Sequence, residues 1–368
     1  GQWYLHLFDS SQPDLNWDNP EVNQDFEATF RFWIELGADG FRIDVAHGLV
    51  KEDIHKDHAD PEGLSAALRL DVLMEPAKRN ELLASNPFFD RDGVHEIYRK
   101  WRKLFDSYQG RDIMAVAEIW VQPPTRATLY VRKDELQQFF NFDVMNSPFE
   151  SKHLYENISN TLNLVKAEAA WPTWCLSNHD CERVASRIGA DAARAMALFV
   201  LGLPGSTYIF NGQELGLPTG EMSDGDRQDP IYFRTRGKEK GRDGARVPLP
   251  WSGDRAPFGF TTGKPWLPLQ DSWRNYTVEA QENDADSSLN LYRRAIAIRK
   301  ERFIGSGDIQ WLSTDGILSY RRGQITVILN TTEENYKFEG EVLLASGDTR
   351  GNTSGNLPPR SAVWLTNS

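Results

Sequence analysis

Three short strings, far apart in the chain, each place a carboxylate where a buried strand would end. They are G-F-R-I-D, which ends in Asp44, A-V-A-E-I-W, which contains Glu118, and L-S-N-H-D, which ends in Asp180. In a β/α barrel, groups at the carboxyl ends of different strands converge on one site. Cleavage of a glycosidic bond with retention uses one carboxylate as nucleophile and a second as acid and base. The strings therefore predict carboxylate chemistry on such a bond.

The residues beside the first two carboxylates fit these roles. Arg42 precedes Asp44 by two positions, so both side chains would leave a strand on the same face. A cation there would favour the ionised carboxylate that a nucleophile needs. Trp120 follows Glu118 by two positions, and an apolar neighbour raises a carboxyl pKa, as a general acid requires. We therefore expect Asp44 to be the nucleophile and Glu118 the acid and base.

The elements that must position these residues alternate between helices and short apolar strands, which indicates an α/β fold with a parallel sheet. Asn19 and Pro20 are typical of a helix start, and a second helix is predicted over 94–108. The predicted strands are 41–45, 113–119, 139–144, 173–177 and 206–210, and further helices are predicted over 190–201 and 288–302. The long polar segment 47–89 predicts a lid at the mouth of the site.

The composition excludes several classes of partner. A formal net charge of −12 argues against nucleic acid or an anionic membrane, and no apolar run is long enough to predict a membrane span. The two cysteines, Cys175 and Cys181, are expected to be free thiols in a reducing compartment, so we predict a cytoplasmic location. No loop has Asp and Asn at metal-ligand spacing, and neither a metal nor a cofactor is expected.

At the three strings the chain resembles the α-amylase family of glycosidases, family 13, and within it the α-glucosidase and oligo-1,6-glucosidase branch. The resemblance implies that Asp44 is the nucleophile, with Arg42 beside it, and that Glu118 is the acid and base. It also implies that Asp180 stabilises the transition state and that His179 binds the glucose in subsite −1.

Two further strings are similar to segments of this branch. The string Q-P-D-L-N, residues 12–16, matches a short signature near the end of domain B. The string G-R-D-G-A-R-V-P-L-P-W, residues 241–251, resembles an R-D-x-x-R-x-P-x-x-W segment. An arginine in this segment is similar to the family's arginine that binds the 4-hydroxyl at the non-reducing end of the sugar. We expect Arg242 to have this role, supported by Asp243, with Arg246 as the alternative.

The resemblance implies an α/β fold: a (β/α)8 TIM barrel, of which this chain holds strands four to eight, followed by a small antiparallel β-sandwich. We expect residues 1–18 to end domain B, 19–304 to form the barrel part with the lid 47–89, and 305–368 to form the β-domain. The family's D-x-x-x-N-H string is absent from the sequence. We therefore expect a separate N-terminal chain to supply this string together with strands one to three. The alternative is that both parts belong to one polypeptide whose numbering is interrupted.

The predicted function is that of a retaining, exo-acting α-glucosidase on short oligosaccharides of the isomaltose, maltose or sucrose type. In this branch a valine at the position of Val45, after the nucleophile, is associated with a preference for cleaving α-1,6 bonds. Its branched side chain would limit space at subsite +1. The continuation Ala46-His47-Gly48 is not the usual one, so a mixed α-1,4/α-1,6 or sucrose-active enzyme stays open. The alternatives are an α-glucosyltransferase or sucrose isomerase, capable of transglycosylation, and a non-catalytic relative.

Overall fold

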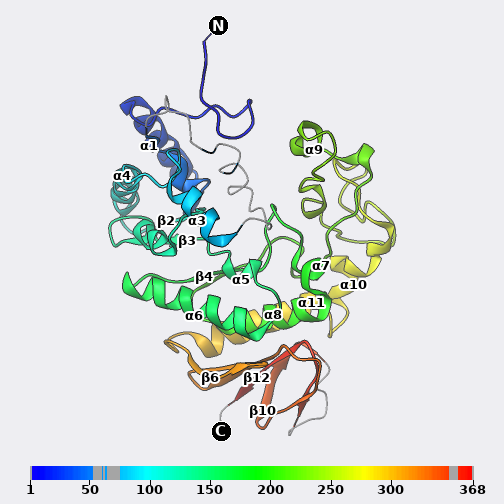
Figure 1. Ribbon diagram of the computed structural model, residues 1–368. Coiled ribbons are helices and arrows are strands. Elements are labelled where there is room, and N and C mark those ends of the chain that lie inside the picture. The colour runs from blue at the N-terminus through cyan, green and yellow to red at the C-terminus, as the bar shows by residue number, and fades with distance from the viewer. Residues whose placement is uncertain (1, 53–59, 61–62, 64–74, 348–354, 367–368) are drawn as a thin grey trace. The chain divides into compact units, whose positions relative to one another are not determined.

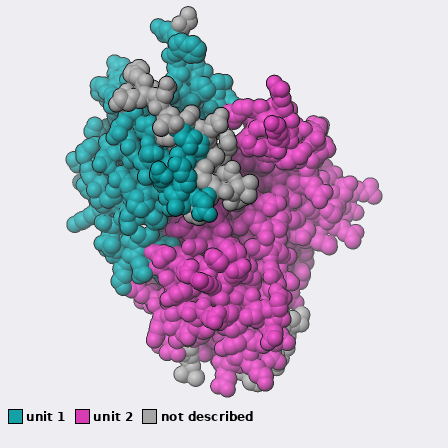
Figure 2. Space-filling model, viewed as in Figure 1, with its two compact units in different colours: residues 1–140, 161–172 teal, residues 141–160, 173–368 magenta. Residues whose placement is uncertain are grey.

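The predicted site residues fall in two units of the chain, which Figures 1 and 2 show. The computed structural model describes residues 2–52, 60, 63, 75–347 and 355–366. The first unit comprises residues 1–140 and 161–172, and the second comprises residues 141–160 and 173–368. The lid is predicted over residues 47–89, and the middle of this segment lies outside the described residues.

A parallel sheet in the first unit carries two of the predicted carboxylates. Its strands are β1 (Gly40–Ile43), β2 (Met114–Ala117) and β3 (Gln138–Phe139), in the order β1-β2-β3. Ile43 pairs with Ala117 at the ends of β1 and β2, so the next residue on each strand, Asp44 or Glu118, leaves the sheet at the same edge. The strand register thereby brings together two residues that are distant in sequence.

The helices of the first unit include the two that the sequence predicts, one from Asn19 and one over 94–108. They are α1 (Pro20–Glu35), α3 (Pro76–Ala84) and α4 (Val94–Asp106), with the 3-10 turns η1 (Ala46–Gly48) and η2 (Pro124–Val131). The Asn19 side chain accepts the N–H of Glu21 at the start of α1, with proline at the first helical position, which satisfies one of the open N–H groups there. One face of α4 is buried, and Trp101 on this face is 1% exposed.

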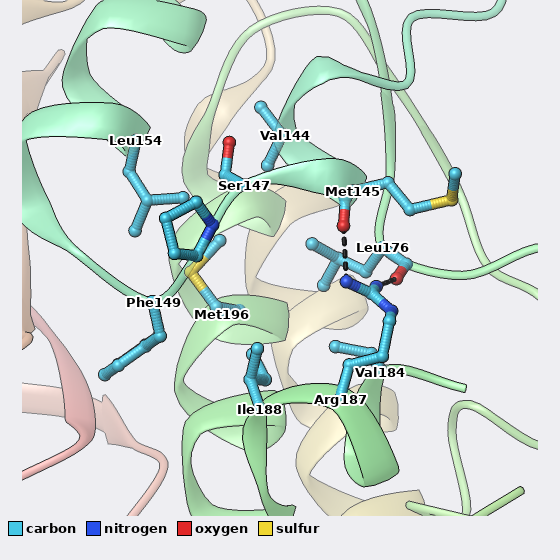
Figure 3. Close-up of a pocket in the computed structure, with 11 residues that line it drawn as sticks. Val144, Met145, Ser147, Phe149, Leu154, Leu176, Val184, Arg187, Ile188 and Met196 are labelled. Carbon is cyan, nitrogen blue, oxygen red and sulfur yellow. Dashed lines mark hydrogen bonds between the residues drawn. The ribbon is translucent and has the colours of Figure 1, made fainter. Parts of the chain in front are cut away.

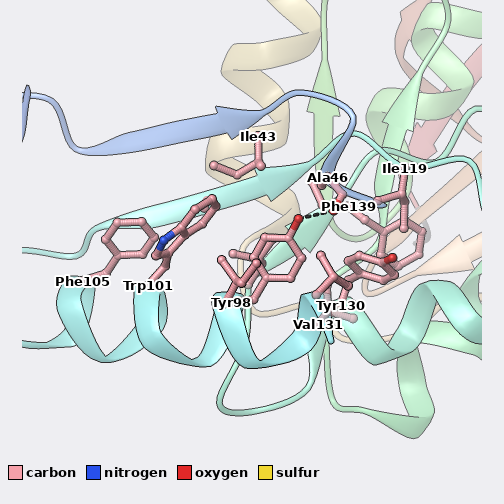
Figure 4. Close-up of a cluster of buried hydrophobic side chains, with 14 of the residues drawn as sticks. Ile43, Ala46, Tyr98, Trp101, Phe105, Ile119, Tyr130, Val131 and Phe139 are labelled. Carbon is pink, nitrogen blue, oxygen red and sulfur yellow. Dashed lines mark hydrogen bonds between the residues drawn. The ribbon is translucent and has the colours of Figure 1, made fainter. Parts of the chain in front are cut away.

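An aromatic core beneath β1 and β2 supports the ends of these strands (Figure 4). Trp101 of α4 lies edge-on to Phe30 of α1, with ring centroids 4.8 Å apart. Tyr98, one turn earlier on α4, is fully buried and donates its hydroxyl to the carbonyl of Ala46. Buried aromatic rings contribute large apolar areas to a core, so the turn that follows β1 rests on a rigid base.

The second unit contains a second pair of parallel strands. These are β4 (Thr173–Cys175) and β5 (Ser206–Tyr208), in register from Thr173 and Ser206 onward. Its helices are α5 (Asp143–Asn146), α6 (Ser151–Ala167, which ends in the first unit), α7 (Val184–Ile188), α8 (Ala190–Gly202), α9 (Pro230–Arg234), α10 (Val278–Glu282) and α11 (Ser288–Ile298). Shorter turns are the 3-10 turns η3 (Asp224–Asp226), η4 (Asp243–Ala245) and η5 (Asp271–Tyr276), and the π-helical turn η6 (Arg299–Phe303).

An antiparallel sheet ends the chain and packs on α8. It runs in the order β10-β12-β8-β7-β6. Its strands are β6 (Gln310–Asp315), β7 (Ile317–Arg322), β8 (Ile325–Asn330), β10 (Glu341–Ala345) and β12 (Ser361–Thr366), and β9 (Tyr336–Lys337) pairs with β11 (Asn356–Leu357). Trp364 donates its indole N–H to Leu198 of α8 at 3.0 Å. A Cβ at Gly202 would lie 2.4 Å from the Tyr320 hydroxyl, so this close contact requires glycine.

The predicted elements differ from the structure mainly at their ends. The strand predicted over 139–144 is wrong beyond its first residue, because Asn141 accepts the N–H of Asp143 and helix α5 begins there. Strand β6 was not predicted. Its residues are exposed or only partly buried, so the strand has no buried apolar face. The helix predicted over 288–302 ends as α11 at Ile298 and continues as the π-helical turn η6. None of the helices in the described part of the chain is long and apolar enough to cross a bilayer.

Candidate active site

Asp44 stands at the end of β1 and is open to solvent. Its carboxylate forms an ion pair with Arg42 Nη1 at 2.8 Å, and 68% of its side chain is exposed. The two side chains therefore share one face of the strand, as their spacing predicts. The Arg42 guanidinium also lies over the ring of Phe140, 6.0 Å from its centroid. This arrangement leaves the Asp44 carboxylate oriented by a cation and accessible to a ligand.

Glu118 is held by the turn that carries Asp44. Its Oε2 accepts the N–H of Val45 at 2.9 Å, and its Oε1 accepts the indole N–H of Trp120 at 2.5 Å. Its own N–H donates to the carbonyl of Ile43, and its carbonyl accepts the N–H of Ala46. Four hydrogen bonds thus fix the main chain and the carboxyl of Glu118, which is 9% exposed.

The surroundings of Glu118 favour its protonated form. Burial raises its pKa and outweighs the N–H groups of Val45 and Trp120, which lower it. Among the nearby charges, Asp44 raises this pKa further and Arg42 lowers it. Trp120 does not raise the pKa as expected of an apolar neighbour, since its indole donates a hydrogen bond to the Glu118 carboxylate and so lowers the pKa. A carboxyl group with a raised pKa, held by uncharged donors, can act as a general acid.

Val45 contributes its main chain to this arrangement. Its φ of 43° and ψ of 46° place it in the left-handed region, where a β-branched residue is a genuine outlier. Such strain persists where surrounding contacts hold it, often at functional sites. A Cβ at Gly48 would lie 2.9 Å from Val45 Cγ1 and 3.0 Å from the Phe89 ring, so glycine is required for the tight turn that aims the Val45 N–H at Glu118.

His47 packs next to Glu118 as an uncharged group. Burial lowers the pKa of its ring to about 3, although a hydrogen bond to the main chain of Glu118 opposes the shift. The ring stacks on Phe89 with centroids 4.8 Å apart. His47 therefore adds no positive charge beside the carboxyl near neutral pH. Its place in the site was not predicted.

Two cavities differ in what they could hold. In the first unit, a cavity of about 210 Å³ is lined by Asp44 and Val45 and by residues of the Q-P-D-L-N string 12–16. In the second unit, a cavity of about 10 Å³ lies among apolar side chains, beside the Arg187 guanidinium that donates to the carbonyl of Met145 (Figure 3). The second has room for about one water and none for a sugar ring.

The second unit gathers the remaining predicted residues around Asp180. Its Oδ1 accepts hydrogen bonds from Arg242 Nη1 and Arg246 Nη2, each at 2.9 Å. The ring of His179 lies 3.4 Å from Oδ2 of Asp180, and Arg246 Nε donates to the carbonyl of His179. Both arginines that the sequence offered as alternatives therefore contact the same carboxylate. The side chains of His179, Asp180 and Arg242 are each more than 40% exposed.

The carboxylate that supports Arg242 is Asp229, which sequence reasoning missed. Asp229 Oδ2 accepts Arg242 Nε at 2.8 Å and the Arg242 main-chain N–H at 2.9 Å. Burial alone would raise the pKa of Asp229, but hydrogen bonds from Arg242 and from the N–H of Ile231 lower it to about 2. The dipeptide Asp229-Pro230, a typical helix start, was the available signal. Asp243 is buried and accepts the N–H groups of Gln228 and Asp229, so it supports the loop that carries Asp229.

Arg183 anchors the loop of Arg242 and Arg246. It donates to the carbonyls of Ala245 and Asn211, at 2.8 and 2.7 Å, and stacks over the ring of Phe210. Burial lowers its pKa to about 10. No spacing in the sequence indicates this contact. Within the described residues, no group of three or more His, Cys, Asp or Glu side chains could hold a metal ion.

Comparisons with known proteins agree with the family resemblance that the sequence motifs indicate. Residues 1–307 match the family model described as the alpha amylase catalytic domain. The chain is 29% identical to an oligo-1,6-glucosidase of Bacillus cereus over 92% of its own length and 65% of that protein. It is 30% identical to a probable alpha-glucosidase of Rhizobium meliloti over 90% of its own length and 62% of that protein. The chain thus spans less than two thirds of the length of these curated relatives.

Solved structures confirm the predicted fold class, a β/α barrel followed by an antiparallel β-domain. An alpha-glucosyl transfer enzyme, XgtA, matches 99% of this chain and 70% of its own, with a TM-score of 0.76 and 28% identity. An isomaltulose synthase from Erwinia rhapontici NX5 matches 100% of this chain and 72% of its own, with a TM-score of 0.82 and 23% identity, which is evidence for the fold alone. The chain therefore belongs to the alpha-amylase catalytic domain family and is similar to its oligo-1,6-glucosidase and alpha-glucosidase members.

Proposed function

We propose that this chain carries the catalytic carboxyls of a retaining, exo-acting α-glucosidase that hydrolyses short oligosaccharides. The observation that carries the proposal is the linked pair at the ends of β1 and β2. Glu118 is buried, has a raised pKa and accepts the N–H of the residue that follows Asp44. Asp44 is exposed and paired with Arg42. Two carboxyls with such different surroundings suit an acid and a nucleophile.

In the proposed reaction, the Glu118 carboxyl gives its proton to the leaving oxygen while an Asp44 oxygen attacks the anomeric carbon. The glycosidic C–O bond breaks and a β-glucosyl ester of Asp44 forms. Glu118, now a carboxylate, takes a proton from water, whose oxygen displaces Asp44 and releases α-glucose. This route expects the two carboxyls to stand about 5–5.5 Å apart. We assign to Asp180 and His179 the task of holding hydroxyls and favouring the positively charged sugar in the transition state.

The exo-acting part of the proposal rests on Arg242, which we assign to the non-reducing 4-hydroxyl. Its bonds to Asp229 and Asp180 leave the side chain 42% exposed, so it could still reach a ligand. Arg246 is the second candidate, because it contacts the same oxygen of Asp180. Asp243 supports this group from beneath the loop.

The preferred linkage is proposed to be α-1,6. Val45 lines the same cavity as Asp44, where its branched side chain would restrict the leaving group. Relatives of Bacillus cereus and Parageobacillus thermoglucosidasius are named oligo-1,6-glucosidases, which supports this preference. Maltose and sucrose are the competing substrates to compare.

A second candidate is transfer of the glucosyl group to another sugar. The alpha-glucosyl transfer enzyme XgtA is 28% identical over nearly the whole chain, and a trehalulose synthase, MutB, is 26% identical over all of it. The same carboxyls would serve, because the ester on Asp44 can react with a sugar hydroxyl as well as with water. The acceptor would then decide the product.

A proton NMR time course of the native preparation with isomaltose, maltose and sucrose tests the proposal. Initial release of α-glucose, fastest from isomaltose, is the expected result. An isomer of sucrose or a longer saccharide as the first product would favour transfer. Initial β-glucose, or a folded preparation that turns over none of the three sugars, would contradict the proposal.

We further infer a partner and a location. A separate N-terminal chain, carrying the remaining barrel strands and the D-x-x-x-N-H string, would complete the site, in keeping with the 65% of the Bacillus cereus relative that this chain covers. A cytoplasmic location fits the free thiols of Cys175 and Cys181. Native mass spectrometry of an active sample should find both chains. Full activity from a species with the mass of this chain alone would exclude the partner.

A further inference from the structure

The cavity beside Asp44 has one wall made by residues close to the N-terminus. Leu7, Phe8 and residues 12–15 line it on one side, and residues between Asp44 and Lys51 line it on the other. The N-terminal wall is the dark blue segment of Figure 1. Trp17 and Phe26 complete the lining, and among the described residues no strand pairing joins the N-terminal stretch to the residues after β1.

A buried ion pair connects these two stretches. Lys51 Nζ lies 2.6 Å from Asp14 Oδ1, and the two side chains are only 8% and 15% exposed. The other oxygen, Asp14 Oδ2, accepts the N–H of Leu7 at 2.7 Å, and the Asp14 N–H donates to the carbonyl of Leu5. One carboxylate thus closes the N-terminal loop on itself and ties it to the turn that follows the nucleophile strand.

Apolar packing gives this wall little other support. Trp3, Tyr4, Phe8 and Leu15 are all exposed. Hydrogen bonds from the Tyr4 hydroxyl to Ser10 and from the Gln12 N–H to Asp9 join residues of the same loop. A segment with few buried apolar side chains opens at low free-energy cost, so an ion pair of good geometry matters more here than in a packed core.

We propose that the Lys51–Asp14 ion pair fixes residues 5–15 as a wall of the cavity at Asp44 and so determines how tightly the site binds its sugar. The inference rests on the proposed function, and both residues are positioning residues. Lys51 is neutralised by Asp14, and the remaining charge on the cavity lining is that of Asp44. The ligand suited to this wall is therefore an uncharged glucoside, bound through hydroxyls and apolar ring faces.

The test compares Lys51→Met with Lys51→Arg, using Lys103→Met on the exposed side of α4 as the matched control. For the sugar that the native protein turns over fastest, Lys51→Met should raise KM about tenfold, which corresponds to about 1.4 kcal/mol, with kcat within about threefold. Lys51→Arg should restore most of the affinity, and Lys103→Met should change neither constant. An unchanged KM in Lys51→Met, or equal losses in all three variants, would overturn the proposal.

Hydrogen exchange over residues 4–15 provides a readout that needs no substrate. Lys51→Met should exchange faster there than the native protein, while peptides of α4 stay protected. If Lys51→Met does not fold, Asp14→Asn replaces it, because the amide oxygen can still accept the Leu7 N–H. Unchanged exchange in the folded variant contradicts the wall. Faster exchange in a protein that cleaves no glucoside would uphold the wall and reject the proposed function.

Discussion

Glu118 of the first unit and Asp180 of the second each accept two hydrogen bonds at the carboxyl group, but their donors differ in charge. Glu118 accepts a main-chain N–H and an indole N–H, and it is buried. Asp180 accepts hydrogen bonds from the guanidinium groups of Arg242 and Arg246, and its side chain is about half exposed. Uncharged donors orient a carboxyl without binding its anionic form as strongly as a cation does.

The difference fits the separate roles that we propose, proton transfer for Glu118 and charge stabilisation for Asp180. A group that must gain and lose a proton needs donors that tolerate both of its forms, and the raised pKa of Glu118 fits that need. A group that meets a positively charged sugar must stay anionic. Asp180 shares Arg242 with Asp229, and hydrogen bonds from Arg242 and from the N–H of Ile231 lower the pKa of Asp229 to about 2, although burial opposes the shift.

The largest expected effect comes from Asp44→Asn. Loss of the nucleophile should reduce kcat/KM roughly 10⁴-fold or more, because no covalent ester can form. Asp44 is exposed at a strand end, so thermal unfolding should be nearly unchanged. Substantial activity in a preparation free of native enzyme would remove Asp44 from its proposed role.

Glu118→Gln tests the proton-transfer side of the comparison. For isomaltose or maltose, the rate should fall about 10²–10⁴-fold, which is the usual contribution of general acid–base catalysis. For 4-nitrophenyl α-glucoside, whose leaving group needs no proton, formation of the ester should slow far less. Single-turnover kinetics on both substrates measures the difference. Equal losses on both would show that Glu118 does not act as the acid.

Arg242→Met and Arg246→Met test the cationic side. Each removes one guanidinium from Asp180, but only Arg242→Met leaves the buried Asp229 without its cation. Arg242→Met should raise KM more and lower the free energy of unfolding by about 2 kcal/mol, measured by urea denaturation. Arg246→Met is the matched control and should unfold like the native protein. Identical stabilities would show that the Asp229 pair contributes nothing.

Trp120→Phe has the smallest expected effect and sharpens the pKa argument. It keeps the ring but removes the indole N–H that favours the Glu118 carboxylate, so the pKa of Glu118 should rise further. The acid form then persists to higher pH, and the alkaline limb of the kcat/KM profile should move upward. Asp44, Arg42 and the uncharged His47 also face this carboxyl and are unchanged. A downward shift would contradict the role of the indole.

The sequence predicted what depends on local pattern. Each carboxylate follows an apolar run that is a strand, and Asp44 and Arg42 share a face because strand side chains alternate. The bond between Val45 and Glu118 joins residues 73 positions apart and requires an unusual backbone conformation that no residue type in the string indicates. Asp229 was missed for a similar reason, since its pair with Arg242 depends on how a long loop folds back on itself.

Trapping of the covalent intermediate tests the central assignment most directly. The native protein would be incubated with 5-fluoro-α-glucosyl fluoride, which forms the ester quickly and releases it slowly, and then digested for peptide mass analysis. We predict one fluoroglucosyl group on Asp44, lost again when the labelled protein is left with a sugar acceptor. A label on Glu118 or Asp180, or no label while the reagent is turned over, would contradict the account.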